Sequence, residues 1–207
     1  MSARGSGRGR FDARNVGGSR GDAAVWLAEA MTVTLTSPDP RYFDSWSATV
    51  AEFGGIHIDG AGLELGASSD RATFDAFVEK AELYGRPGAA LPDGHVPCDY
   101  FWIVDGGEVV GFIAFRRELN DWLRRVGGHI GYSVRPSRRR EGIVSAALRL
   151  VLDRARAEGY DRVMLTCDDD NPGSFRTIEG AGGVLQDVVD ATDAGHPRLR
   201  RYWIPLV

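Results

Sequence analysis

The chain has 207 residues, a formal net charge of −4 at pH 7 and 43% hydrophobic residues, which is ordinary for a globular protein. This length suits one domain with a real hydrophobic core and is too short for two. No apolar run reaches the roughly 18 residues of a membrane span, and no apolar stretch follows the N-terminal arginines, so we expect neither a membrane protein nor a secretory signal. Cys98 and Cys167 show no zinc-type spacing, and the four histidines offer no metal pair. We therefore expect a cytoplasmic protein without a metal site.

The first 20 residues are rich in Gly, Ser and Arg and carry five arginines and one acidic residue. Such a segment cannot bury enough apolar surface to order itself. We expect residues 1–30 to form a disordered basic extension and residues 31–207 to form a single domain. The extension is either passive, as would follow if the gene started at Met31, or a basic arm that touches nucleic acid. Because it lacks interleaved aromatic residues and repeats, the passive interpretation is favoured.

The first half of the domain reads as one strand and two helices. Residues 31–37 alternate polar and apolar residues, which predicts a short strand. Apolar residues at helical spacing predict a helix over 41–53, and the Gly-rich segment 54–69 predicts a loop. Asp70 is a plausible cap of a second helix, and three prolines mark 85–98 as loop.

The second half begins with two apolar runs around Asp105-Gly106-Gly107, a strong hairpin signal. A further strand is predicted to end at Val134, because Arg135-Pro136 follows and proline cannot continue a central strand. Helical spacing then returns from Val144, and Asn171-Pro172 predicts the start of another helix. The remaining predicted strands are Arg162–Cys167, Val184–Val189 and Arg200–Ile204. The order indicates an α/β or mixed α+β fold, a mixed sheet flanked by helices.

Four arginines between Arg135 and Arg140 lie between the Pro-ended strand and an amphipathic helix. The start of a helix leaves backbone N–H groups free at the positive end of its dipole. Gly142 allows close approach of a ligand to the backbone, and arginines add forked donors. This pattern predicts a phosphate-binding loop, although a short charge run can also be a solvated face. The Walker and Rossmann fingerprints are both absent, which argues against a nucleoside triphosphate or a dinucleotide as the ligand.

The segment "GHIGYSVRPSRRREGIVSAALRLVLDRA" resembles the acyl-CoA-binding segment of the GNAT superfamily of acetyl-CoA-dependent N-acetyltransferases. The family signature has Arg or Gln, then Gly three residues later, then Gly or Ala two residues after that. Arg139 and Gly142 match the first two positions, and Val144 stands where the signature has the small residue. The segment "DDDNPGSFRTIEGAGGVLQDV" is similar to a second signature, an Asn followed by a helix and a Gly pair. The similarity is good over residues 99–204 and looser over residues 31–98. The chain resembles a poorly characterised bacterial branch of this superfamily. This resemblance implies a central, mostly antiparallel, splayed sheet of about six to seven strands flanked by about four helices.

The resemblance also implies a set of residues that bind acetyl-CoA. The strand that ends at Val134 would pair its backbone with the pantetheine arm, the loop and helix start would hold the pyrophosphate, and Asn171 would contact the thioester end. Asn171 is equally explained as a helix cap alone. The residues expected to bind the cofactor are Tyr132, Ser133, Val134, Arg139, Arg140, Glu141, Gly142, Ile143, Val144, Ser145, Asn171 and Ser174.

Direct acetyl transfer to an amine requires a general base and a proton for the leaving thiolate. Glu118 and His129 are the candidate bases, because Glu118 ends a strand near the substrate mouth of the family fold and histidine titrates near neutrality. A surface carboxylate and a satisfied core histidine are the alternative interpretations. Many relatives carry a tyrosine seven residues after the asparagine, where this chain has Ile178. Water, Tyr132 or Tyr160 would then have to protonate the thiolate.

Three functions remain open at this point. The favoured one is an N-acetyltransferase that acts on a primary amine of a small molecule or peptide, with residues 31–98 forming the acceptor pocket. The second is a non-catalytic CoA-binding module, which Val144 and Ile178 keep open. The third, a nucleic-acid-binding protein, predicts steep salt dependence. The acid run from Asp168 to Asp170 is read as a solvated loop rather than a metal site, since no further acids complete one. The family fold also allows a homodimer.

Overall fold

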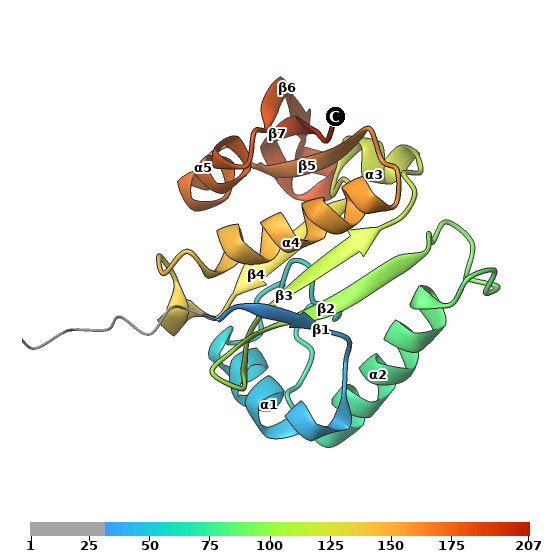
Figure 1. The fold of residues 1–207 in the computed structure, drawn as a ribbon, viewed down its shortest axis with the longest axis vertical. Coiled ribbons are helices and arrows are strands. Elements are labelled where there is room, and N and C mark those ends of the chain that lie inside the picture. The colour runs from blue at the N-terminus through green and yellow to red at the C-terminus, as the bar shows by residue number, and fades with distance from the viewer. Residues whose placement is uncertain (1–31) are drawn as a thin grey trace, which may run out of the picture. The chain divides into compact units, whose positions relative to one another are not determined.

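Within the described residues, strands from both halves of the domain form two antiparallel sheets, of four and three strands, with five α-helices around them (Figure 1). The computed structural model describes residues 32–207, so the predicted basic extension lies outside the described residues. The described strands are β1 (Thr34–Thr36), β2 (Cys98–Asp105), β3 (Glu108–Arg116), β4 (Ile130–Val134), β5 (Arg162–Asp168), β6 (Val184–Ala191) and β7 (His196–Pro205). The described helices are α1 (Phe43–Glu52), α2 (Arg71–Gly85), α3 (Asp121–Arg125), α4 (Ile143–Ala157) and α5 (Pro172–Gly180). This arrangement confirms the predicted fold class.

The four-stranded sheet, in the order β1-β2-β3-β4, is covered by helices on both faces. Successive side chains of a strand point to opposite faces, so Trp102 and Phe112 pack toward α1 and α2, while Ile103 and Ile113 pack toward α4. Figure 1 shows the same layering, with α4 on one side of this sheet and α1 and α2 on the other. Burial on both faces explains why β2 and β3 read as nearly continuous apolar runs.

The three-stranded sheet has the order β5-β7-β6, and β5 meets β4 only near the beginning of β4. There, Gly128 and Leu165 form an isolated bridge, and the His129 N–H donates to the Met164 carbonyl at 2.7 Å. From that junction onward, β4 and β5 belong to different sheets. The two strands therefore part from one another, which is the splay expected from the family resemblance.

The predicted helix starts at Asp70 and Asn171 are confirmed. The Asp70 carboxylate accepts from the Thr73 N–H at 2.8 Å, and the Asn171 side chain accepts from the Ser174 N–H at 3.1 Å. One helix, α3, was not predicted from the sequence. Its five residues are too few to show a helical period, and it begins at Asn120, whose side chain accepts from a backbone N–H.

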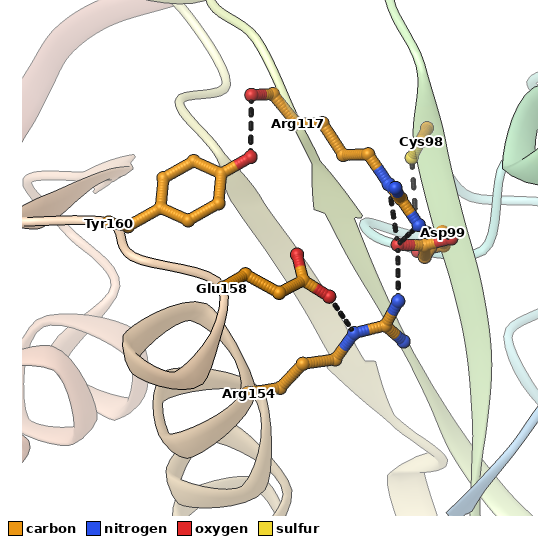
Figure 2. A network of polar contacts seen from close by, with 6 residues as sticks. All are labelled: Cys98, Asp99, Arg117, Arg154, Glu158 and Tyr160. Carbon is orange, nitrogen blue, oxygen red and sulfur yellow. Dashed lines mark hydrogen bonds and ion pairs between the residues drawn. The ribbon is translucent and has the colours of Figure 1, made fainter. Parts of the chain in front are cut away.

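A network of ion pairs joins α4 to β2 and the end of β3 (Figure 2). The Asp99 side chain on β2, only 11% exposed, accepts from the Nε and Nη2 atoms of Arg117 at 2.9 Å each and from Nη2 of Arg154 at 3.0 Å. Arg154 also donates to Glu158 one turn later, and the Tyr160 hydroxyl donates to the Arg117 carbonyl at 2.8 Å. The network therefore joins β2, the end of β3 and the C-terminal half of α4.

None of the helices described within residues 32–207 is both long and apolar enough to cross a membrane. The predicted cytoplasmic location stays a prediction.

Candidate active site

A cavity of about 630 Å³ lies where β4 and β5 part. Its lining comes from both sheets, from the segment that joins α1 to α2, and from the first turns of α4 and α5. Eleven of the twelve residues predicted to bind the cofactor line it: Tyr132, Ser133, Val134, Arg139, Arg140, Gly142, Ile143, Val144, Ser145, Asn171 and Ser174. The twelfth, Glu141, is not among the lining residues, and its carboxylate accepts from Nε of Arg138 at 2.8 Å.

The beginning of α4 forms an anion cradle at one end of the cavity. Gly142 is the N-cap residue with φ of 78°, and no side chain caps the helix. The Ala146 N–H donates to the Gly142 carbonyl at 3.0 Å, so the N–H groups of the preceding turn have no partner within the helix. Arg140 also has a positive φ, of 68°, which is uncommon for a residue with a Cβ. Alternation of left-handed residues before a helix builds a concave row of N–H groups suited to phosphate.

The four arginines of this loop divide into two pairs. Arg135 donates to Glu52 at 2.7 Å, and Arg138 donates to Asp105 at 2.7 Å. Within residues 32–207, by contrast, no carboxylate pairs with Arg139 or Arg140, and both line the cavity. Two arginines therefore hold the loop in place, and two present unneutralised charge to a ligand.

Glu52, at the end of α1, holds the arginine loop (residues 135–140) in place. Its carboxylate accepts from Nε of Arg135, from the Ser137 N–H and from the Ser137 hydroxyl. Burial acts to raise the pKa of Glu52, but the hydrogen bonds from Arg135 and Ser137 outweigh it and lower the pKa overall. The carboxylate therefore stays ionised and tied to the loop at neutral pH.

The free edge of β4 faces the other side of the cavity. The Arg116 N–H donates to the His129 carbonyl at one end of the β3–β4 ladder, and the Arg135 N–H donates to the Val110 carbonyl at the other. Hydrogen-bonded pairs alternate in an antiparallel ladder, so the even-numbered residues of β4, Tyr132 among them, turn their backbone N–H and C=O groups outward. These groups can pair with an extended ligand or stabilise a developing negative charge.

Two hydroxyl groups meet across the gap between the sheets. The Tyr132 and Ser174 hydroxyl oxygens are 2.9 Å apart, and burial raises the pKa of Tyr132. Ile178, at the position where many relatives carry a tyrosine, is fully buried in the core and does not line the cavity. Tyr160 donates its hydroxyl to the Arg117 carbonyl and is also outside the lining. Of the two tyrosines considered from the sequence, Tyr132 lines the cavity and Tyr160 does not.

The cysteine beside them is Cys167, on β5. Burial raises the pKa of its thiol to about 11, so it is protonated at neutral pH. A protonated thiol is a weak nucleophile, so this state does not favour a catalytic role for Cys167.

The structure does not bring the two candidate bases, Glu118 and His129, into the cavity. Both line a separate, shallow depression with Trp203. His129 Nδ1 accepts from the Met164 N–H at 2.8 Å, and burial, with two nearby arginines, lowers its pKa to about 4. His129 is therefore a neutral, hydrogen-bonded core histidine at the junction of the sheets. The base must be sought among the residues that do line the cavity.

Four titratable side chains of the lining, His57, Asp59, Arg116 and His196, were missed in the sequence, and a fifth, Asp168, was assigned to a solvated loop. Nε2 of His57 lies 3.4 Å from Oδ1 of Asp59, Nδ1 of His196 lies 2.6 Å from Oδ1 of Asp168, and Arg116 reaches the cavity from the end of β3. The only signal for the first pair was a histidine two residues before an aspartate in a Gly-rich segment. Chain folding, rather than any local motif, brings these groups to the cavity.

Gly60 holds the segment with His57 and Asp59 against β4. A Cβ at Gly60 would lie 2.2 Å from the carbonyl oxygen of Gly131, and its φ is 77°. Only glycine allows this approach. Asp59 and Tyr132 both line the cavity. The segment that carries the His57–Asp59 pair therefore packs against β4 at Gly131.

A family model described as "Acetyltransferase (GNAT) family" matches residues 69–182, more than half of the chain. The chain belongs to this family. The predicted family and enzyme class, an acyltransferase, are thereby confirmed. No curated protein matches this GNAT acetyltransferase in a sequence search.

Solved structures similar to this GNAT acetyltransferase include the microcin C7 self-immunity acetyltransferase MccE in complex with acetyl-CoA and AMP, with a TM-score of 0.64, 16% identity and coverage of 84% of this chain and 92% of that one. A Salmonella typhimurium acetyltransferase that modifies the N-terminal serine of ribosomal protein L7/L12 has a TM-score of 0.62, 16% identity and coverage of 84% and 94%. Mycobacterium smegmatis RimJ in complex with CoA-disulfide has a TM-score of 0.66, 21% identity and coverage of 84% and 81%. At these identities the likeness shows a shared fold.

Proposed function

We propose that this GNAT acetyltransferase transfers an acetyl group from acetyl-CoA directly to a primary amine of a small molecule or peptide. The observation that carries the proposal is one cavity with an anion cradle at the start of α4 and a histidine–carboxylate pair beside β4. Two similar structures are described with acetyl-CoA or with a CoA species, and another is described as modifying an N-terminal serine. These descriptions support an acetyl-CoA donor and an amine acceptor.

The cavity residues fit acetyl-CoA along its length. The uncapped N–H groups at the start of α4, with Arg139 and Arg140, suit the pyrophosphate. The outward backbone groups of β4 suit the amides of the pantetheine arm, and Asn171 lies at the opposite wall. When bound, acetyl-CoA supplies an acetyl group activated as a thioester.

The remaining steps belong to side chains of this protein. The outward N–H of Tyr132 is placed to stabilise negative charge on the acetyl oxygen. The paired hydroxyls of Tyr132 and Ser174 hold a proton for the departing sulfur. With Nε2 of His57 directed to Asp59, Nδ1 of His57 is the atom that takes the proton of the amine.

His57 is suited to this task by its surroundings. The hydrogen bond to Asp59 raises the pKa of His57 above its ordinary value, against the opposing effects of burial and Arg116, and Glu64 adds to the increase. A base whose pKa lies near the working pH is the most efficient one. A second histidine–carboxylate pair, His196 with Asp168 at the end of β5, lines the same cavity. His196 is therefore a matched comparison for His57.

The His57 assignment predicts the pH profile of kcat/KM. His57 accepts a proton only when neutral, so kcat/KM should rise with pH and level off above the raised pKa of His57. His57→Gln should remove this acidic limb and lower the plateau about 100-fold. Asp59→Asn should shift the limb to lower pH, because the carboxylate no longer favours the charged ring. The measurement is the pH dependence of CoA release, with His196→Gln as the control that should retain the wild-type limb.

Acetyl-CoA titration followed by an amine screen tests the proposed function. We expect micromolar binding by calorimetry, weakened about tenfold in Arg139→Ala through loss of a charged hydrogen bond. Arg149→Ala removes the same charge from the exposed side of α4, outside the cavity, and should bind normally. CoA release should then appear with primary amines. No binding by folded protein would contradict the proposal, and binding without release by any amine would favour a non-catalytic CoA-binding module.

A further inference from the structure

Arg116 presents an unneutralised positive charge to the cavity, away from the phosphate cradle. It is the last residue of β3, is partly buried, and lines the cavity beside Gly131 near the beginning of β4. A Cβ on Gly131 would lie 3.6 Å from both Nη atoms of Arg116. Arg139 and Arg140, by contrast, follow the other end of β4. The length of this strand therefore separates two groups of cationic side chains.

The hydrogen bonds of Arg116 leave part of its guanidinium available. Nη1 donates to the Gly127 carbonyl at 3.3 Å and to the Gly128 carbonyl at 3.2 Å. These bonds hold the plane of the guanidinium. Among the interactions described for residues 32–207, Nε and Nη2 have no acceptor, and no carboxylate lies within ion-pair distance. The remaining N–H groups of such an arginine are oriented to donate two parallel hydrogen bonds to a planar anion such as a carboxylate.

The neighbouring residue, Arg117, shows what the fold does with an arginine that serves structure. Its guanidinium forms a bidentate pair with Asp99, as Figure 2 shows. Other arginines that anchor loops and strands, among them Arg135, Arg138 and Arg201, also pair with carboxylates. A partly buried arginine without a carboxylate is costly unless a ligand completes it. Arg116 therefore has the properties of a ligand-binding group.

We propose that Arg116 binds a carboxylate of the acceptor, which makes the acceptor an amine that carries a carboxylate close to its amino group. This inference rests on the proposed function. The acetyl-CoA phosphates are met by the start of α4, so the second cationic group is left for the other substrate. Gly131, beside the guanidinium, directly precedes Tyr132, whose outward N–H faces the acetyl oxygen in the proposed reaction.

The acceptor must fit between Arg116 and His57, the proposed base, because both side chains line the same cavity. The amine must reach His57 while the carboxylate reaches Arg116. Free amino acids satisfy this requirement, and so does a peptide with an acidic residue next to its N-terminus.

The test compares matched amines on the full-length enzyme. Free amino acids are assayed against the amines obtained by removing their carboxylate, with CoA release as the readout. Dipeptides with Asp or Asn in second position distinguish a peptide carboxylate from that of a free amino acid. We expect kcat/KM to favour the carboxylated member of a pair about 100-fold. In Arg116→Gln this preference should fall to within about threefold, while Arg116→Lys should retain part of it.

The control variant is Arg124→Gln, which removes an exposed arginine from the separate depression and should keep the preference. Equal rates for both members of each pair in the wild type, or a preference that survives Arg116→Gln, would overturn the proposal. A second measurement decides the matter if no amine in the panel reacts. Amino acids and their decarboxylated amines are titrated into the CoA-saturated protein, and binding of the neutral member alone, or of neither, would overturn it. Acetyl-CoA binding, measured separately, reports on the proposed function itself.

Discussion

Replacing Gly142 with aspartate should raise the Kd for acetyl-CoA about 100-fold or more. Two effects add. Gly142 has φ of 78°, a left-handed conformation that costs a residue with a Cβ about 1–2 kcal/mol. The free loop of the variant would relax away from this conformation, and binding would have to restore it. The new carboxylate would also lie at the entrance to the anion cradle, where it repels the phosphates that Arg139 and Arg140 attract. Together these effects correspond to about 3 kcal/mol, which is about two orders of magnitude in affinity.

Gly142→Asn separates the two effects. Asparagine adopts the left-handed conformation more readily than most residues and carries no charge, so it should weaken binding only a few-fold. Calorimetric titration with acetyl-CoA measures both variants, and circular dichroism checks that both are folded. If Gly142→Asp bound acetyl-CoA as tightly as the wild type, the loop before α4 would not be the phosphate site.

Asp99→Asn should lower the free energy of unfolding by about 3 kcal/mol. Asp99 is the buried centre of the network in Figure 2, where it neutralises both Arg117 and Arg154. The amide keeps the shape of the side chain but leaves two partly buried guanidinium groups without their counterion, a loss that typically costs about 3–5 kcal/mol. The lower end is expected here because Arg117 and Arg154 are 31% and 36% exposed and keep some hydration.

Urea denaturation followed by circular dichroism measures this change in stability. Glu158→Gln is the matched control, because Glu158 pairs with Arg154 at the outer side of the network and is 33% exposed. It should cost less than about 1 kcal/mol, as exposed ion pairs do. A loss below 1 kcal/mol in Asp99→Asn would show that solvent, rather than Asp99, balances the two arginines.

Local features of the chain were sufficient to predict most of the elements and one half of the cavity. Asp70 and Asn171 cap helices through hydrogen bonds to residues three positions away, so a short stretch of sequence is enough to predict their role. The Pro-ended strand, the arginine loop and Gly142 lie within a dozen residues, and the start of a helix binds anions through its own backbone. Such features do not depend on what the rest of the chain does, which is why they could be read in advance.

Tertiary structure alone decided which arginines are free and where the reaction can take place. Arg135 pairs with a carboxylate 83 residues away. Arg138 pairs with one 33 residues away as well as with the nearby Glu141, so the loop sequence alone did not separate these two arginines from Arg139 and Arg140. His129 looked like a candidate base in sequence, but the junction of β4 and β5 binds its ring nitrogen to a backbone N–H. His57 and Arg116 come from different elements and meet at the cavity only because Gly60 lets its segment pack on β4. The sequence by itself determines which charged and titratable groups are present. Long-range packing then decides which of them are paired, which are buried and which line the cavity.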